Sequence, residues 1–111
     1  GSMAAKFAYD HPAAIEALIF LASYPAKSND FSQSNLDVLS IYASNDAFAT
    51  KEKIEASKVL LPSDTVFYEI QGGNHSQFAS YGFQKGDGVA DISSDEQLMI
   101  VVDRITQFLM K

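Results

Sequence analysis

Apolar residues in this chain of 111 residues gather into three short runs and one longer periodic stretch. The first run begins at Ile15 and ends at Ala22. It is almost wholly apolar and lies between turn-forming residues, which predicts a strand buried on both faces. Residues 36–43 predict a second strand, and residues 65–70, rich in β-branched and aromatic side chains, predict a third. These runs are the candidate strands of one sheet.

Helices are predicted before and between these strands. Residues 3–9 form a stretch of small and apolar residues that should end before Pro12, because proline disfavours the helical conformation of the residue preceding it. Thr50 is a candidate N-cap with Glu52 in the first turn. The helix that Thr50 begins is expected to stop before Pro62.

The last helix has the clearest signals. Ser93 and Glu96 have the spacing of a capping box at its start. Apolar side chains then recur at helical spacing, which predicts one face packed on the core: Leu98, Val101, Val102, Ile105, Phe108 and Leu109. Strands that alternate with helices pair in parallel through right-handed crossovers. The expected fold class is therefore α/β, a three-stranded parallel sheet with flanking helices.

Composition narrows the class of protein. The net charge is -6 and the pI is about 4.6, which argues against a nucleic-acid surface and against binding to anionic membranes. There is no cysteine, so disulfides, thiolate metal sites and a cysteine nucleophile are excluded. No apolar run approaches the length of a membrane-spanning helix, and the start of the chain does not read as a signal peptide. The cytoplasm is the default expectation for its location.

An acid and a histidine follow the second and third predicted strands. Asp46 comes just after the apolar run 36–43, and His75 comes just after the run 65–70. In open α/β sheets, ligands bind beyond the carboxyl ends of the strands, so both side chains are expected at that edge. An acid and then a histidine in this order is the second half of the Ser…Asp…His arrangement of hydrolases that carry a G-x-S-x-G turn.

With these motifs the chain resembles the C-terminal part of an α/β-hydrolase. Residues 39–46 (LSIYASND) resemble the strand end that bears the acid, although the glycine of the usual G-x-x-D is replaced here. Residues 72–78 (GGNHSQF) resemble the histidine loop, and residues 81–88 (YGFQKGDG) resemble a loop of a bacterial branch of the superfamily. The resemblance implies the last three of the usual eight strands.

The resemblance also implies roles. Asp46 would be the triad acid and His75 the general base, and no residue matches the nucleophile, which would fall just upstream together with the oxyanion-hole donors. We read Gly1 and Ser2 as a tag scar and residues 3–111 as the C-terminal part of the domain. The expected function is that of a fragment of a serine hydrolase, inactive alone, whose full-length parent hydrolyses small carboxylic esters or lactones. The alternative is a non-catalytic self-associating interaction or ligand-binding domain.

Other interpretations of the polar residues remain open. Asp46 can be an ordinary turn residue, and His75 a polar residue of a glycine-rich loop. His11 is interpreted as a structural residue at a helix end. A cation-binding loop would use Gly86, Asp87, Gly88, Asp91 and Asp95, but these residues lack the spacing of an EF-hand. A replacement nucleophile near His75 would be Ser76 or Ser80, but neither has the geometry of a nucleophile elbow. We expect no cofactor and no metal.

The first strand has a further consequence. In a complete hydrolase sheet it would have a neighbour on each side, and here the strand from Ile15 to Ala22 would present one unpaired edge. We therefore expect a homo-oligomer in which this edge pairs antiparallel with its own copy across a two-fold axis.

Overall fold

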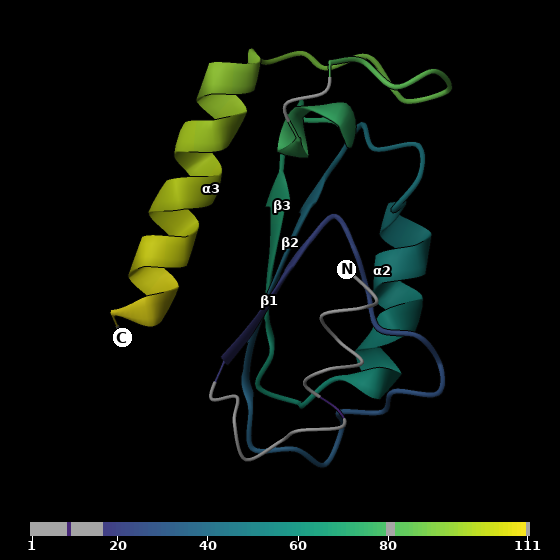
Figure 1. Ribbon diagram of the computed structural model, residues 1–111, viewed down its shortest axis with the longest axis vertical. Coiled ribbons are helices and arrows are strands. Elements are labelled where there is room, and N and C mark those ends of the chain that lie inside the picture. Colours follow the sequence, from purple (N-terminus) through teal and green to yellow (C-terminus); the bar gives the residue numbers. More distant parts are fainter. Residues whose placement is uncertain (1–8, 10–16, 80–81, 111) are drawn as a thin grey trace.

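The computed structural model describes Tyr9 and residues 17–79 and 82–110 (Figure 1). Within them, three parallel strands form one sheet in the order β1-β2-β3. The strands are β1 (Ala17–Leu21), β2 (Asp37–Ala43) and β3 (Val66–Ile70). The α/β class and the parallel sheet predicted from the sequence are therefore confirmed, with β1 ending one residue early and β2 and β3 each beginning one residue late; Ile15 and Glu16 lie outside the described residues.

Burial differs between the strands because of their places in the sheet. All of β2 except Asp37 is buried, which suits a central strand with a helix on each face. In β1, Leu18 and Phe20 are buried, whereas Leu21 is 38% exposed. The prediction that the first strand is buried on both faces is thus wrong for its described residues. Within the described part of the chain β1 is an edge strand, and the face that carries Leu21 is incompletely covered.

One face of the sheet is covered by α2 (Lys51–Ser57), which continues as the 3-10 turn η2 (Lys58–Leu60) (Figure 1). The predicted cap is present, because the hydroxyl oxygen of Thr50 accepts a hydrogen bond from the N–H of Lys53. Ile54 is fully buried at the centre of a small apolar cluster with Ala22, Tyr42 and Ala49. The helix therefore follows the predicted span, with its last turn tightened from α to 3-10 before Pro62.

The opposite face is covered by α3 (Ser94–Leu109) (Figure 1). The Ser93 hydroxyl accepts from the N–H of Glu96 at 3.1 Å, as the capping signal predicts. Val101 and Phe108 pack with Leu39, Ile41 and Ile70.

The predicted apolar face of α3 is only partly correct. Leu98, Val102 and Leu109 are 58%, 55% and 61% exposed. The side that meets the sheet carries Gln97, Val101 and Phe108, which are buried. Arg104 stacks 4.0 Å over the Tyr68 ring of β3. By helical geometry residues 98, 102 and 109 lie about a third of a turn around the helix from this buried side.

Between β3 and α3 runs a long connection that contains the 3-10 turn η3 (Ser76–Phe78). The predicted first helix falls almost wholly outside the described residues; Tyr9 is helical, and its ring packs edge-on to that of Phe31. Among the described residues, α3 is the longest helix, and no helix there has the length and apolar character needed to cross a bilayer.

Candidate active site

Asp46 lies in the turn that follows β2. Beyond the end of β2, two backbone hydrogen bonds join this turn to the end of β3 and the segment after it. Ser44 N–H donates to the Ile70 carbonyl at 3.0 Å, and Asn45 N–H donates to the Gly73 carbonyl at 2.9 Å. The side chain of Asp46 is fully buried. One of its oxygens, Oδ1, accepts from the N–H groups of Phe48 at 2.7 Å and Ala49 at 2.8 Å. Asp46 is therefore a turn residue, as one interpretation held, and its second oxygen remains available.

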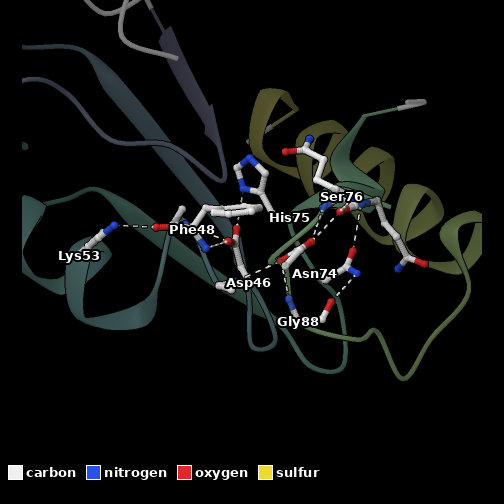
Figure 2. Close-up of polar contacts among 12 residues, drawn as sticks. Asp46, Phe48, Lys53, Asn74, His75, Ser76 and Gly88 are labelled. Carbon is white, nitrogen blue, oxygen red and sulfur yellow. Dashed lines mark hydrogen bonds and ion pairs between the residues drawn. The ribbon is translucent and has the colours of Figure 1, made fainter. Parts of the chain in front are cut away.

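That second oxygen meets His75. The His75 Nδ1 lies 2.8 Å from Asp46 Oδ2 (Figure 2). The histidine side chain is 28% exposed and the aspartate side chain 0%. The Phe48 ring stands edge-on to the imidazole at 5.3 Å between centroids and fixes its plane from one side. The two residues selected from the sequence are thus in direct contact at the carboxyl ends of adjacent parallel strands.

The histidine loop approaches α3 too closely for any side chain at Gly73. A Cβ there would lie 2.7 Å from Oε1 of Gln97 and 3.2 Å from the Cβ of Ala43. Gln97 is fully buried, and its amide pairs with both backbone groups of Asn74: Oε1 accepts from the N–H at 3.2 Å, and Nε2 donates to the carbonyl at 3.0 Å. The amide of Gln77 donates to the same Oε1 at 2.7 Å. α3 therefore holds the backbone of the residue directly before His75.

Asp87 holds the backbone on the other side of His75. Its Oδ2 accepts from both the N–H of Ser76 at 2.8 Å and the Ser76 hydroxyl at 2.7 Å. Its Oδ1 accepts from the N–H of Ala47 at 3.1 Å and of Gly88 at 2.8 Å. Burial disfavours the charged form of Asp87, but the hydrogen bonds from Ser76, Ala47 and Gly88 outweigh it and lower the pKa of the carboxyl below its ordinary value. The group is an ionised acceptor that joins two loops.

The structure bears on two of the open interpretations. The Asp87 carboxylate binds backbone N–H groups, and Asp91 accepts from the amide of Asn45; within the described residues no group of three or more acidic or histidine side chains is arranged to hold a metal. Ser76 is buried, donates its hydroxyl proton to Asp87 and accepts from the N–H of Gln84, so its oxygen is not presented to a substrate. His11 and Ser80 lie outside the described residues.

Two residues of the site were missed by sequence reasoning in this role. The sequence does carry a signal for a buried polar role of Gln97. It stands four positions before Val101, so it lies with Val101 on the side of α3 that faces the sheet. The sequence presents Asp87 only as a candidate cation ligand. Its partners are backbone groups 11 and 40 residues away, and no local pattern reports such bonds.

Chemically, the pair is suited to proton transfer. A buried carboxylate that accepts from Nδ1–H selects the tautomer in which Nε2 carries a lone pair. Nε2 lies on the side of the ring away from Asp46 (Figure 2). Within the described residues Nε2 has no hydrogen-bond partner, so it is free to take a proton from an incoming group.

Comparison with known proteins bears on the same region. The model of a family described as alpha/beta hydrolase matches residues 1–99, which include all three strands, Asp46 and His75. Neither the curated proteins nor the solved structures gave a significant match. The family match covers well over half of the chain, and the parallel sheet with a helix layer on each face agrees with it. The chain therefore belongs to the alpha/beta hydrolase family.

Proposed function

We propose that Asp46 and His75 are the acid and the general base of a Ser-His-Asp triad that hydrolyses carboxylic esters. The observation that carries the proposal is the 2.8 Å contact between Nδ1 of a partly exposed histidine and Oδ2 of a fully buried aspartate. Its place supports the proposal further, because both residues follow the carboxyl ends of adjacent parallel strands, where α/β sheets bind ligands.

In the proposed reaction a serine hydroxyl attacks the ester carbonyl while Nε2 of His75 accepts its proton. Asp46 holds the imidazole in the required tautomer and stabilises the imidazolium that forms. His75 then returns the proton to the leaving alcohol. It next accepts a proton from the water that attacks the acyl-enzyme, and returns that proton to the serine oxygen as the acyl–serine bond breaks and the carboxylic acid leaves. The two hydrogen bonds from Phe48 and Ala49 to Oδ1 hold the Asp46 side chain in place, with Oδ2 directed at His75, throughout this sequence.

The nucleophile is proposed to come from a segment outside this sequence. The sequence of 111 residues contains no G-x-S-x-G motif. In this arrangement the oxyanion-hole donors are the N–H of the residue after the nucleophile and an N–H of an earlier loop. We therefore propose that the chain is the C-terminal part of a serine hydrolase and does not hydrolyse esters alone. Small esters or lactones are the proposed substrates, because the connection between β1 and β2 is too short for a large helical lid.

Two observations test the proposal. The first is the genomic sequence upstream of the codon for Met3, where an in-frame G-x-S-x-G is expected; a stop codon followed by a ribosome-binding site there would count against it. The second is treatment of this chain with a fluorophosphonate that reacts with activated serines. We expect no labelling, and stoichiometric labelling would overturn the claim that the nucleophile lies elsewhere.

A second candidate function, a non-catalytic self-associating domain, is supported by the edge of β1. Among the described residues, β1 has a hydrogen-bonded neighbour only in β2, and Leu21 at its end is exposed. Antiparallel pairing with a second copy would give the open backbone groups partners. Light scattering at micromolar concentration is expected to show a dimer that Leu21→Lys weakens. A strictly monomeric chain would exclude this candidate.

A further inference from the structure

We propose that Asp87 is a positioning residue for His75, because one carboxylate joins the residue after the acid to the residue after the base. The proposal rests on the proposed role of His75 as a general base. The two residues that Asp87 binds are Ala47, which follows Asp46, and Ser76, which follows His75. The distance between the two loops is thereby fixed at the point where their side chains must meet.

The two oxygens divide this task. Oδ1 accepts from Ala47 N–H at 3.1 Å, and Oδ2 accepts from Ser76 N–H at 2.8 Å and Ser76 Oγ–H at 2.7 Å. A carboxylate accepts at both oxygens, so it serves both loops at once. An asparagine has one acceptor oxygen and one donor nitrogen, and the nitrogen would face an N–H group on one of the two sides. Asp87→Asn therefore breaks the bridge while changing the volume very little.

The segment that carries Asp87 is itself held against the acid loop. A Cβ at Gly88 would overlap the carbonyl oxygen of Asn45, so the backbone passes this loop at a distance that only glycine allows. The Gly88 carbonyl accepts from Nδ2 of Asn74 at 2.9 Å, as Figure 2 shows. Gly88 N–H also donates to Oδ1 of Asp87, which orients the carboxylate. The bridge is thus anchored on both loops and does not depend on a flexible arm.

Asp87 differs from Gln97, which holds the same loop from the other side. Gln97 binds the backbone of Asn74 and makes no hydrogen bond to the loop of Asp46. It fixes the His75 loop to α3, whereas Asp87 fixes it to the loop of its catalytic partner. We therefore expect Asp87 to control the geometry between Asp46 and His75 specifically, with an effect on the imidazole beyond any effect on folding.

The test reads the tautomer of His75 directly. The chain has two histidines, so in a long-range ¹H–¹⁵N correlation spectrum the signals of His75 are identified by their loss in His75→Gln. In the wild-type chain we expect the tautomer protonated at Nδ1. In Asp87→Asn we expect a mixture of tautomers and an exchange of the Nδ1 proton with water that is about tenfold faster, the effect of weakening one charge-assisted hydrogen bond.

The matched control is Asp91→Asn. Asp91 is in the same loop; its side chain accepts from Asn45 Nδ2 and its N–H donates to the Gly72 carbonyl, so its hydrogen bonds within the described residues do not reach Ala47 or Ser76. This variant is expected to keep the wild-type tautomer. If Asp87→Asn loses its folded spectrum, Ser76→Ala decides the matter, because it removes the hydroxyl bond to Oδ2, together with the acceptor of Gln84 N–H, and leaves the Ser76 N–H bond to Asp87 in place. Its Nδ1 proton is expected to exchange about threefold faster, as for the partial loss of the bridge.

An unchanged tautomer and exchange rate in folded Asp87→Asn, or in Ser76→Ala, would overturn the positioning role. These readings need no substrate and no nucleophile. Absence of esterase activity in the full-length protein would therefore overturn the proposed function alone, and an unchanged His75 spectrum in these variants would overturn the role of Asp87 alone.

Discussion

Replacement of Gln97 by methionine is expected to destabilise the fold strongly for a single side chain. Gln97 is fully buried, and its amide pairs with the N–H and the carbonyl of Asn74, itself a buried residue. Methionine is unbranched and of similar length, so it fills the same space without leaving a large cavity. What it cannot replace is the pair of hydrogen bonds, and both backbone groups of Asn74 are then left buried without their partner.

The magnitude follows from the cost of such groups. A buried donor or acceptor that loses its partner costs about 1–3 kcal/mol, so two of them cost roughly 2–6 kcal/mol. Partial relaxation and entry of water bring the expected value to about 3 kcal/mol, against a total stability of about 5–15 kcal/mol for a single domain. For a domain of this size that corresponds to a fall in Tm of about 10 °C or more.

Urea unfolding followed by circular dichroism measures this change. Gln107→Met on the same helix is the control, because Gln107 is exposed and bonds only Asp103 one turn away. The control should change the free energy of unfolding by less than about 0.5 kcal/mol. If Gln97→Met costs no more than the control, the Asn74 groups are satisfied in another way and Gln97 does not hold the histidine loop on α3.

Three further predictions concern the same loops. Gly73→Ala places a Cβ 2.7 Å from Gln97 Oε1 and should destabilise by about 1–3 kcal/mol in urea unfolding; an unchanged midpoint would mean that the loop and α3 separate easily. The pKa of Asp87 is lowered in the fold, so its contribution to stability is present above its ordinary value of 3.8 and is lost as pH falls through the lower folded value. The stability of wild type should therefore fall more steeply below about pH 4 than that of Asp87→Asn, and parallel curves would contradict this. Phe48→Ala removes the ring that stands edge-on to His75 and should speed exchange of the Nδ1 proton about threefold, as measured by NMR, and an unchanged rate would show that the ring does not shield the imidazole.

Much of the fold follows from local signals in the sequence. Thr50 and Ser93 are N-caps whose side chains bond the backbone three residues on, and both are recognisable from neighbouring residues alone. The contact between Asp46 and His75 follows from the rule that parallel strands bring their carboxyl ends to one edge. The two caps are encoded within a few residues of where they act, whereas the contact follows from the order and direction of the strands.

The remainder depends on which surfaces meet. Periodicity identifies the apolar positions of α3 but not which of them face the sheet, so Leu98, Val102 and Leu109 were expected in the core and are exposed. The Asp87 carboxylate joins backbone groups that are far apart in the sequence. The sequence alone does not distinguish it from any other ionised residue of the loop. Such contacts are set by the packing of loops against one another and are found only in three dimensions.

The proposed chemistry is tested most directly by ester hydrolysis in the full-length protein, read in frame from upstream of Met3 through this chain. Initial rates on a small p-nitrophenyl ester would be compared for wild type, Asp46→Asn and His75→Gln, with Asp64→Asn, an exposed acid just before β3, as the control. We expect kcat to fall by about 10⁴ in the first two variants and to remain unchanged in the control. Rates within tenfold of wild type for Asp46→Asn and His75→Gln would contradict the assignment of this pair as the acid and base of a serine hydrolase.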